Sequence, residues 1–355
     1  MEFIASPEPF ETMSPVMLGL VVIAAFYFLT RGADLLVEAA SGLALRLGLS
    51  KIIVGATVVA LGTTSPEAAV SVLAAWDGKP ELALGNAIGS IIADTALIFG
   101  LGCVLVALPA DRFVLTRHGW VQFGAAILLA GLCFTAFLID GEAAAITRPV
   151  GVLLLAGLVW YMVMSVRWSR QHPAHGADMA VEDAGVDVEQ ARRSSVLKLL
   201  CLLVLGLVLV LLSSRFLILG VSETAVRLGV PNVVIAATLV ALGTSLPELA
   251  TAIAAIIKGH YEIMVGNIIG ADILNVLFVV GAAAVAADLR IIETGSPAPH
   301  MLLYLHLPFL VGIIVMFRLF IFRALRTGSF ARWMGVPLLA SYVAYVALQF
   351  TLSTG

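Results

Sequence analysis

Two glutamates with matching neighbours are the residues of this chain best suited to ion chemistry. Glu67 and Glu248 each directly follow a proline inside a long apolar stretch. Because proline has no backbone N–H and frees a carbonyl oxygen, we expect one helix to be interrupted at Gly62 and Pro66 and the other at Pro247. Two buried glutamates repel each other unless a positive charge lies between them. The pair therefore predicts a cation-binding site.

The polar side chains around these glutamates supply oxygen. Hydroxyls flank both of them, at Thr63, Thr64, Ser65, Thr244 and Ser245. No Lys, Arg or His stands in the same stretches. A set of carboxylate, hydroxyl and carbonyl oxygens without nitrogen or sulfur suits a hard cation such as Ca²⁺, which takes about 6–8 oxygens, and disfavours zinc or copper.

Both glutamates belong to an internal repeat. Residues 55–67, GATVVALGTTSPE, match residues 236–248, AATLVALGTSLPE, at nine of thirteen positions. Residues 85–94, GNAIGSIIAD, match residues 266–275, GNIIGADILN, at five of ten, with the same offset of 181 residues and no gap between the two matches. One offset over two segments indicates that the chain contains a duplicated unit.

The second segment of the repeat adds further polar residues. Ser90 and Asp94 lie four residues apart and so share one helix face; their counterparts are Ala271 and Asn275. Asp272 has no acidic counterpart, because an isoleucine takes its place in the first copy. We expect Asp272 to make a helix-end contact or to face a cavity.

The stretches that carry these motifs are membrane spans. The chain has 355 residues, of which 61% are hydrophobic and only 12% are charged, and several uncharged stretches approach or exceed the roughly 18–20 residues that cross a bilayer as a helix. We predict ten spans: 15–43, 50–76, 81–108, 117–139, 147–169, 195–226, 231–257, 261–287, 300–323 and 331–352. A polar linker, 170–194, separates a first repeat, 15–169, from a second, 195–352.

The distribution of positive charge predicts the orientation. Fourteen of the twenty Lys and Arg residues fall in loops on one side and four in loops on the other, so the N-terminus is expected outside and the 170–194 loop in the cytoplasm. The copies begin in the second and seventh spans, five crossings apart, and therefore run in opposite directions. The predicted fold is an all-α membrane protein with ten transmembrane helices in two inverted-topology five-helix repeats, an architecture typical of secondary transporters.

The paired motifs resemble the α-repeats of the cation/calcium exchanger superfamily, of the sodium/calcium exchanger type, which read G-T-S-x-P-E followed by G-N-x-x-G-S-N-x-x-N/D. The resemblance implies that Glu67 and Glu248 are the central Ca²⁺ ligands, helped by the carbonyls of Thr63 and Thr244. It further implies flanking Na⁺ sites and a middle site built from the side chains of Thr64, Ser245 and Ser90, the carbonyls of Ala60 and Ala241, and the pair Asp94 and Asn275.

The sequence departs from this pattern at three places. The first copy reads G-T-T in place of G-T-S, which keeps the hydroxyl. Ala271 stands where a serine ligand is usual, which puts one Na⁺ site in question. Asp94 and Asn275 exchange the usual order of Asn and Asp, and the number of carboxylates is unchanged.

These observations predict a secondary active antiporter that exchanges Ca²⁺ for Na⁺ by alternating access, in the inner (plasma) membrane. Ca²⁺/H⁺ exchange and K⁺-dependent exchange on the same fold remain alternatives, although the hydroxyls favour Na⁺. A cation channel and an intramembrane aspartyl protease using Asp94 and Asp272 are remote, because the two aspartates do not correspond in the repeat. We expect no enzyme activity and no cofactor. The expected partners are small inorganic cations and the lipid bilayer, with no obligatory protein partner, and the net charge of −3 argues against nucleic acid.

Overall fold

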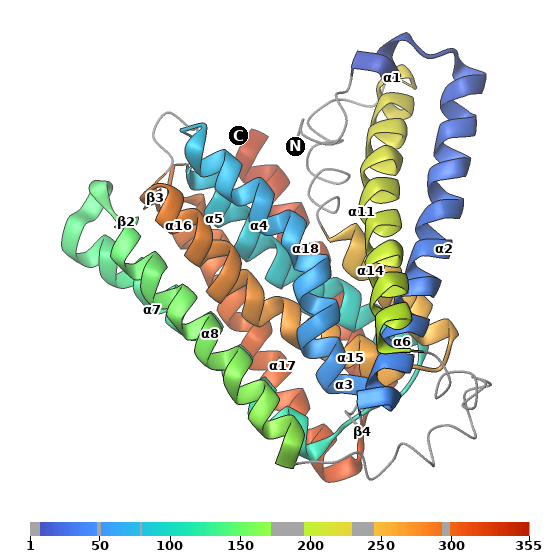
Figure 1. The fold of residues 1–355 in the computed structure, drawn as a ribbon. Helices are drawn as coiled ribbons and strands as arrows, with labels where there is room; N and C mark the ends of the chain where they lie inside the picture. The colour runs from blue at the N-terminus through green and yellow to red at the C-terminus, as the bar shows by residue number, and fades with distance from the viewer. Residues whose placement is uncertain are drawn as a thin grey trace.

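The structure is a computed structural model that describes residues 8–47, 51–78, 80–171, 195–228, 245–292 and 299–354. Across these residues, nine helical segments are long and apolar enough to cross a membrane. The shorter apolar helix Leu246–Ile257 is the described part of the seventh predicted span. The helical segments pack into one bundle (Figure 1), which confirms the predicted all-α membrane fold.

The chain divides into two halves with the same order of elements. The first half comprises α1 (Glu8–Thr12), α2 (Pro15–Leu47), α3 (Lys51–Val54), the π-helix η1 (Gly55–Val59), α4 (Ala60–Trp76), α5 (Pro80–Ile92), the π-helix η2 (Ala93–Phe99), α6 (Gly100–Leu105), β1 (Leu108–Pro109), α7 (Arg112–Asp140), the 3₁₀-helix η3 (Gly141–Ala143), β2 (Ala145–Ile146) and α8 (Arg148–Gln171). The described second half comprises α11 (Val196–Arg227), α14 (Leu246–Ile257), α15 (Tyr261–Leu274), the π-helix η5 (Asn275–Val280), α16 (Gly281–Ala286), β3 (Leu289–Arg290), the π-helix η6 (Leu302–His306), α17 (Leu307–Thr327), β4 (Ser329–Phe330), the 3₁₀-helix η7 (Arg332–Met334) and α18 (Gly335–Thr354).

The repeat found in the sequence extends to the elements themselves. An offset of 181 residues carries the bounds of α6 onto those of α16 and the bounds of β1 onto those of β3. The same offset carries α2 onto α11 within one residue. The duplication therefore covers the first helix of each half as well as the motif segments.

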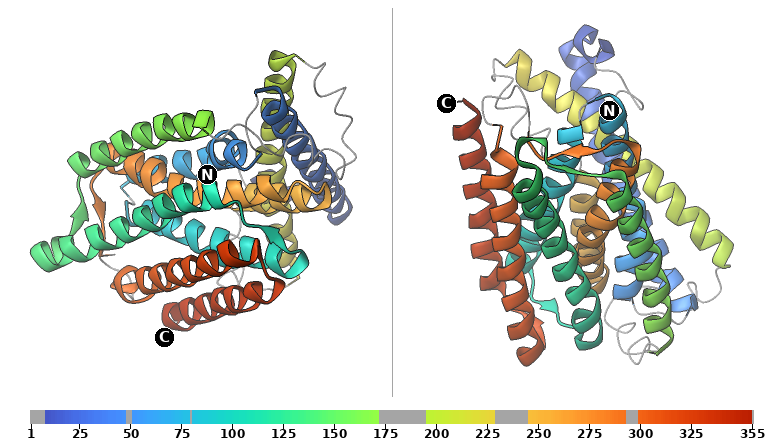
Figure 2. Two further views of the ribbon diagram at one scale, coloured as in Figure 1. Left: turned by 90° about the horizontal axis from the view of Figure 1, so that it is seen from below. Right: turned by 90° about the vertical axis from the view of Figure 1, so that its left-hand side faces the viewer.

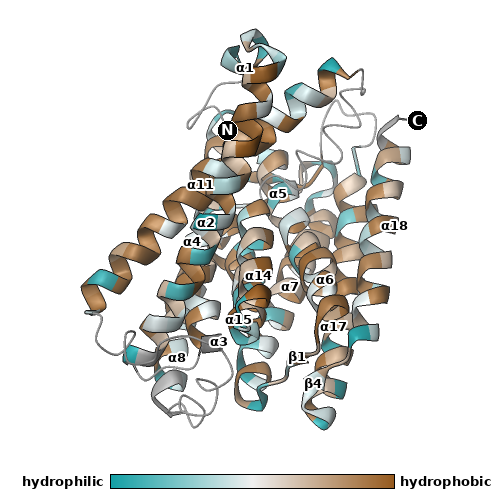
Figure 3. Ribbon diagram, turned by 90° about the vertical axis from the view of Figure 1, so that its right-hand side faces the viewer, coloured by the Kyte–Doolittle hydropathy of each residue, from teal (hydrophilic) through white to brown (hydrophobic). Residues whose placement is uncertain are grey.

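Two short strand pairs show that the halves are inverted. β1 pairs with β4, and β2 pairs with β3, both antiparallel, so each strand pairs with a strand of the other half. The β2–β3 pair lies at the upper end of the bundle in Figure 1 and the β1–β4 pair at the lower end (Figure 3). A strand that follows the same helix in each half thus ends at opposite ends of the molecule, as inverted repeats require.

The first helices of the two halves, α2 and α11, form an antiparallel pair beside the rest of the bundle (Figures 1 and 2). They approach closely at two glycines: a Cβ added to Gly32 would lie 2.8 Å from the Cβ of Leu209, and one added to Gly206 would lie 2.7 Å from the backbone N of Leu36. Such small residues allow helix backbones to meet in a membrane. Large apolar side chains cover much of the outer surface of the pair (Figure 3).

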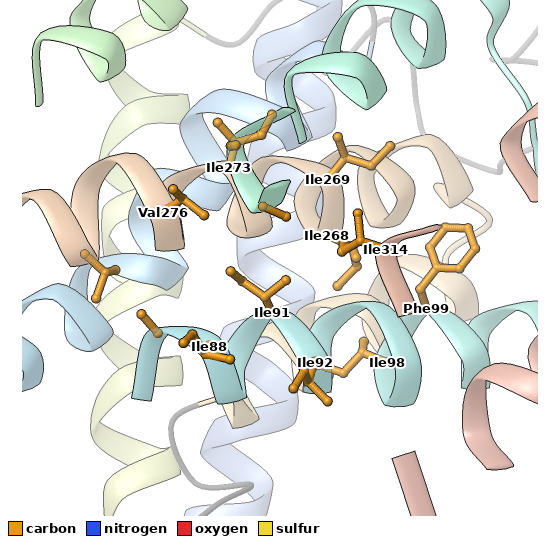
Figure 4. Close-up of a cluster of buried hydrophobic side chains, with 14 of the residues drawn as sticks. Ile88, Ile91, Ile92, Ile98, Phe99, Ile268, Ile269, Ile273, Val276 and Ile314 are labelled. Carbon is orange, nitrogen blue, oxygen red and sulfur yellow. The ribbon is translucent and has the colours of Figure 1, made fainter. Parts of the chain in front are cut away.

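The centre of the bundle is formed by α5 with η2 and α15 with η5. In α15 every residue from Ile263 to Leu274 is buried, so this helix has no outward face. Its isoleucines pack against those of α5, and Ile91, Ile269 and Ile273 lie in one buried cluster (Figure 4). Polar side chains on these two helices are therefore held inside the protein.

The predicted interruption of the second span at its proline is wrong in position. Helix α4 continues through Pro66, and the irregular segment is the π-helix η1, which ends one residue before α4 begins. Pro247 lies in the first turn of α14, where its missing N–H costs least. The residues before Ser245 lie outside the described part of the chain.

A histidine–tyrosine pair joins the fourth and fifth helices of each half. The Nδ1 atom of His118 lies 2.9 Å from the hydroxyl of Tyr161, and that of His306 lies 2.6 Å from the hydroxyl of Tyr345. The Tyr161 hydroxyl also donates to the carbonyl of Ala56 in η1 at 3.3 Å. These pairs align α7 with η6–α17 where the 181-residue offset no longer applies.

Candidate functional site

The two glutamates predicted from the sequence are buried inside the bundle. Glu67 on α4 and Glu248 on α14 are each 1% exposed. One carboxylate oxygen of each, Oε2, has no hydrogen-bond partner within the described structure. The two carboxylates interact electrostatically with each other and with Asp94. The structure thus gathers three like charges that the sequence separates.

Hydroxyl groups of the same two helices accompany the glutamates. The Thr63 hydroxyl lies 3.4 Å from the carbonyl oxygen of Ala60 and 3.4 Å from Oδ1 of Asn267, and it lies near the carboxylate of Glu248. The hydroxyls of Thr64 and Ser245, which occupy corresponding positions in the repeat, are buried and have no partner among the described residues. Thr244 and Ala241, also predicted as ligands, lie outside the described residues.

The predicted middle-site residues lie at the starts of the two central π-helices. Asp94 is the second residue of η2 and Asn275 is the first residue of η5. Oδ1 of each, together with the hydroxyl of Ser90, is buried and lacks a hydrogen-bond partner in the described structure. π-Helical segments are rare and often occur at functional sites because they leave backbone and side-chain groups unpaired.

Oxygen atoms without partners are concentrated at this site. More than about nine in ten buried polar groups in proteins are hydrogen-bonded. Yet seven of the predicted residues carry an unpartnered buried oxygen in the described structure: Glu67, Glu248, Thr64, Ser245, Ser90, Asp94 and Asn275. Such a set of oxygens, three of them on carboxylates, is suited to bind hard cations as substrates.

The arrangement differs from that of a resident metal centre. Within the described residues, no three Asp, Glu, His or Cys side chains converge closely enough to hold one metal ion. A cation between Glu67 and Glu248 therefore needs hydroxyl and carbonyl oxygens to complete its coordination. Ligands of this kind give the weaker, reversible binding that a transported ion requires.

The sequence did not reveal three residues beside the site. Asp272 lies in neither of its two predicted settings: it is 2% exposed, and its Oδ2 accepts hydrogen bonds from the Thr95 hydroxyl and from Nε2 of Gln122, both at 2.5 Å. Gln122 could have drawn notice as the one amide in the uncharged stretch 118–139. Its partner could not, because the two residues are 150 positions apart.

Known proteins share both the sequence and the fold. The putative antiporter CaxA of Alkalimonas amylolytica is 35% identical over 272 residues, which cover 77% of this chain and 80% of CaxA. The sodium/calcium exchanger MaX1 of Methanosarcina acetivorans is 28% identical over 353 residues, covering 93% and 98% of the two chains. A solved structure of the sodium-calcium exchanger NCX_Mj is 26% identical, with a TM-score of 0.74, and the match covers 94% of this chain and 98% of that chain.

The match to a whole family follows the two halves of the molecule. The sequence model described as Sodium/calcium exchanger protein matches residues 17–167 and 198–351. These segments contain both repeat copies and leave out the polar linker between them. The match includes every residue of the site described above, and the chain belongs to the sodium/calcium exchanger family.

Proposed function

We propose that the protein is an antiporter that exchanges Ca²⁺ for Na⁺ across the inner (plasma) membrane. The observation that carries this proposal is the buried pair Glu67 and Glu248, each with an unpartnered carboxylate oxygen. An uncompensated carboxylate inside a membrane protein costs several kcal/mol, and such residues usually mark an ion pathway. A divalent cation between the two glutamates offsets both charges.

The Ca²⁺ ligands in this proposal are the two glutamates and the backbone carbonyls of Thr63 and Thr244. Thr63 supports the assignment because its hydroxyl lies near Glu248, on the other half of the molecule. Its own half supplies Glu67 one turn later on the same helix. Each half thus contributes one carboxylate and one threonine to a shared coordination shell.

The Na⁺ ligands in this proposal surround the same centre. They are the side chains of Thr64, Ser245 and Ser90 and the carbonyls of Ala60 and Ala241, with Asp94 and Asn275 between them. Hydroxyl and carbonyl oxygens coordinate Na⁺ directly, whereas protonation of a glutamate would not need them. Na⁺ and Ca²⁺ compete for the two glutamates, so binding of one ion set displaces the other.

The inverted halves supply a route for alternating access. Two copies of one unit that cross the membrane in opposite directions can exchange conformations, so that the shared site faces one side and then the other. The antiparallel strand pairs at both ends of the bundle support this symmetry. We place the N-terminus outside and the linker 170–194 in the cytoplasm, in agreement with the charge distribution.

The test is uptake of ⁴⁵Ca²⁺ into proteoliposomes loaded with Na⁺, with K⁺ or with acidic choline buffer and diluted into ion-free medium. We expect uptake only from Na⁺-loaded vesicles, and release of the accumulated Ca²⁺ when monensin collapses the Na⁺ gradient. Equal uptake driven by internal acid would instead establish Ca²⁺/H⁺ exchange. Uptake that needs K⁺ together with Na⁺ would establish the K⁺-dependent type.

A further inference from the structure

Asp272 is a buried carboxylate that the exchange site described above does not use. It is 2% exposed on α15, and Thr95 of η2 and Gln122 of α7 both donate to its Oδ2. Its other oxygen, Oδ1, is buried and has no hydrogen-bond partner within the described structure. Two elements of the first half therefore hold this side chain in place and leave one oxygen free.

The fold does not require this carboxylate. At the corresponding positions of the inverted copy, Ile91 replaces Asp272 and Val276 replaces Thr95, both buried in the apolar cluster of Figure 4. Gln122 lies four residues after His118, and four residues after the equivalent His306 is the buried apolar Leu310. The polar triad is thus present on one side of the molecular pseudosymmetry and apolar on the other, which argues against a purely architectural role.

Asp272 lies beside Asp94 and adds to its charge. The two carboxylates interact electrostatically, and Asp94 also interacts with Glu248. Ca²⁺ between the two glutamates offsets two negative charges and leaves those of the two aspartates. Two uncompensated carboxylates this deep are strongly unfavourable, so a further positive charge is needed.

We propose that Asp272 and Asp94 bind a further Na⁺ ion, beside and separate from the position between the two glutamates. The unpartnered Oδ1 atoms of both aspartates face this position from α15 and η2, two elements that pack together. The hydroxyl oxygens of Thr95 and Ser90 provide neutral ligands, and all available donors are oxygen, which suits Na⁺. This inference rests on the proposed function, because it adds one Na⁺ to the exchange cycle.

The same position offers a reason why the second repeat tolerates Ala271. The first copy has a hydroxyl followed by an apolar residue, Ser90 and Ile91, whereas the second has an apolar residue followed by a carboxylate, Ala271 and Asp272. The second half has therefore lost one oxygen ligand and gained another at the next position. The number of Na⁺ ions bound can be preserved in this way.

The test is the number of ²²Na⁺ ions bound per molecule of purified full-length protein at saturation, without Ca²⁺. We expect Asp272→Asn to bind one Na⁺ fewer than the unaltered protein. Thr95→Val, which keeps the carboxylate charge, and Glu262→Gln, which removes an acidic group from the same helix away from the site, should bind the unaltered number. An equal count in Asp272→Asn, or a one-ion deficit seen with ⁸⁶Rb⁺ and not with ²²Na⁺, would overturn the proposal.

Failure of this inference and failure of the proposed function give different results. If the unaltered protein shows no Na⁺-driven Ca²⁺ uptake, the proposed function fails; if it exchanges normally and Asp272→Asn loses no Na⁺, only the further site fails. Should Asp272→Asn not fold, crystals of the unaltered protein grown with Tl⁺ provide a second measurement. An anomalous peak between Asp94 and Asp272 supports the site, and Tl⁺ peaks elsewhere with none there contradict it.

Discussion

At the scale of single residues, the site is defined by oxygens that the protein itself leaves without partners. Thr64 and Ser245 illustrate this, because both hydroxyls are buried, equivalent in the repeat and unpartnered in the described structure. Burying a hydroxyl without a hydrogen bond costs about 1–3 kcal/mol. Keeping two of them in symmetric positions is favourable only if a ligand that is absent from the protein chain completes them.

Asp94→Asn is expected to change the ion dependence of exchange more than the amount of folded protein. The substitution keeps the shape of the side chain and removes a charge that interacts with Glu248 and Asp272. Losing an interaction with a charged group costs about 1.5–3 kcal/mol, so the Na⁺ concentration for half-maximal exchange should rise roughly 10- to 100-fold. The measurement is Na⁺-dependent ⁴⁵Ca²⁺ flux, with the exposed Asp77→Asn as the control. Unchanged Na⁺, K⁺ and pH dependence would show that Asp94 has a structural role only.

The repeat carried most of the residue-scale prediction, because equivalent positions point to one shared centre. Glu67, Glu248 and Asp94 could therefore be predicted to lie together, and the structure brings them into electrostatic contact. Asp272 and Thr95 could not be paired in advance, since they are 177 residues apart and outside the symmetric pattern. Their contact depends on how α15 packs against η2, which no local pattern specifies.

At the scale of elements, the ligands are placed by helices whose regular hydrogen bonding is locally relaxed. The π-helices η2 and η5 begin at Ala93 and Asn275, and η1 ends directly before α4. The sequence predicted irregular backbone from prolines and placed it a turn too late in the second span. Pro66 removes only one helical hydrogen bond, and packing on both sides keeps α4 continuous.

Close contact between η1 and α15 is expected to depend on Gly270. A Cβ at this position would lie 2.5 Å from the carbonyl oxygen of Ala56 and 2.7 Å from its Cα, and both are backbone atoms that cannot rotate away. Gly270→Ala should therefore destabilise the protein by roughly 1–3 kcal/mol, seen as a lower midpoint of thermal unfolding in detergent. Gly312→Ala is the matched control, because a Cβ there meets nothing within 4 Å in the described structure. Equal midpoints for the two variants would show that η1 and α15 can separate without cost.

At the scale of the whole molecule, inverted duplication makes one site accessible from two sides without two separate sites. Antiparallel packing of α2 against α11 and the crossed strand pairs β1–β4 and β2–β3 relate the halves throughout the described structure. The sequence predicted this symmetry from an offset of 181 residues and an odd number of crossings. It did not predict how the halves pack, since that depends on contacts such as Gly32 with Leu209.

The exchange cycle is expected to move net charge if three Na⁺ ions are exchanged for one Ca²⁺. One charge is worth about 2.3 kcal/mol per 100 mV, which corresponds to a change of about 40-fold in the equilibrium Ca²⁺ gradient. The measurement is that gradient in sealed vesicles whose potential is clamped with valinomycin and K⁺. A gradient independent of potential would reject three-for-one exchange and leave the exchanger assignment intact. Ala271→Ser, which restores the hydroxyl found at Ser90, should then bring voltage dependence back.

The central claim is that Ca²⁺ binds between Glu67 and Glu248, and the most direct test replaces each with glutamine. Each variant keeps the side-chain shape and removes one of the two charges that face the ion. Breaking a buried charge interaction by removing one partner costs about 3–5 kcal/mol, so Na⁺-driven ⁴⁵Ca²⁺ uptake should fall by roughly 100-fold or more in each variant. Glu262→Gln, on the same bundle and away from the site, should transport normally. Near-normal uptake by folded Glu67→Gln or folded Glu248→Gln would contradict the account.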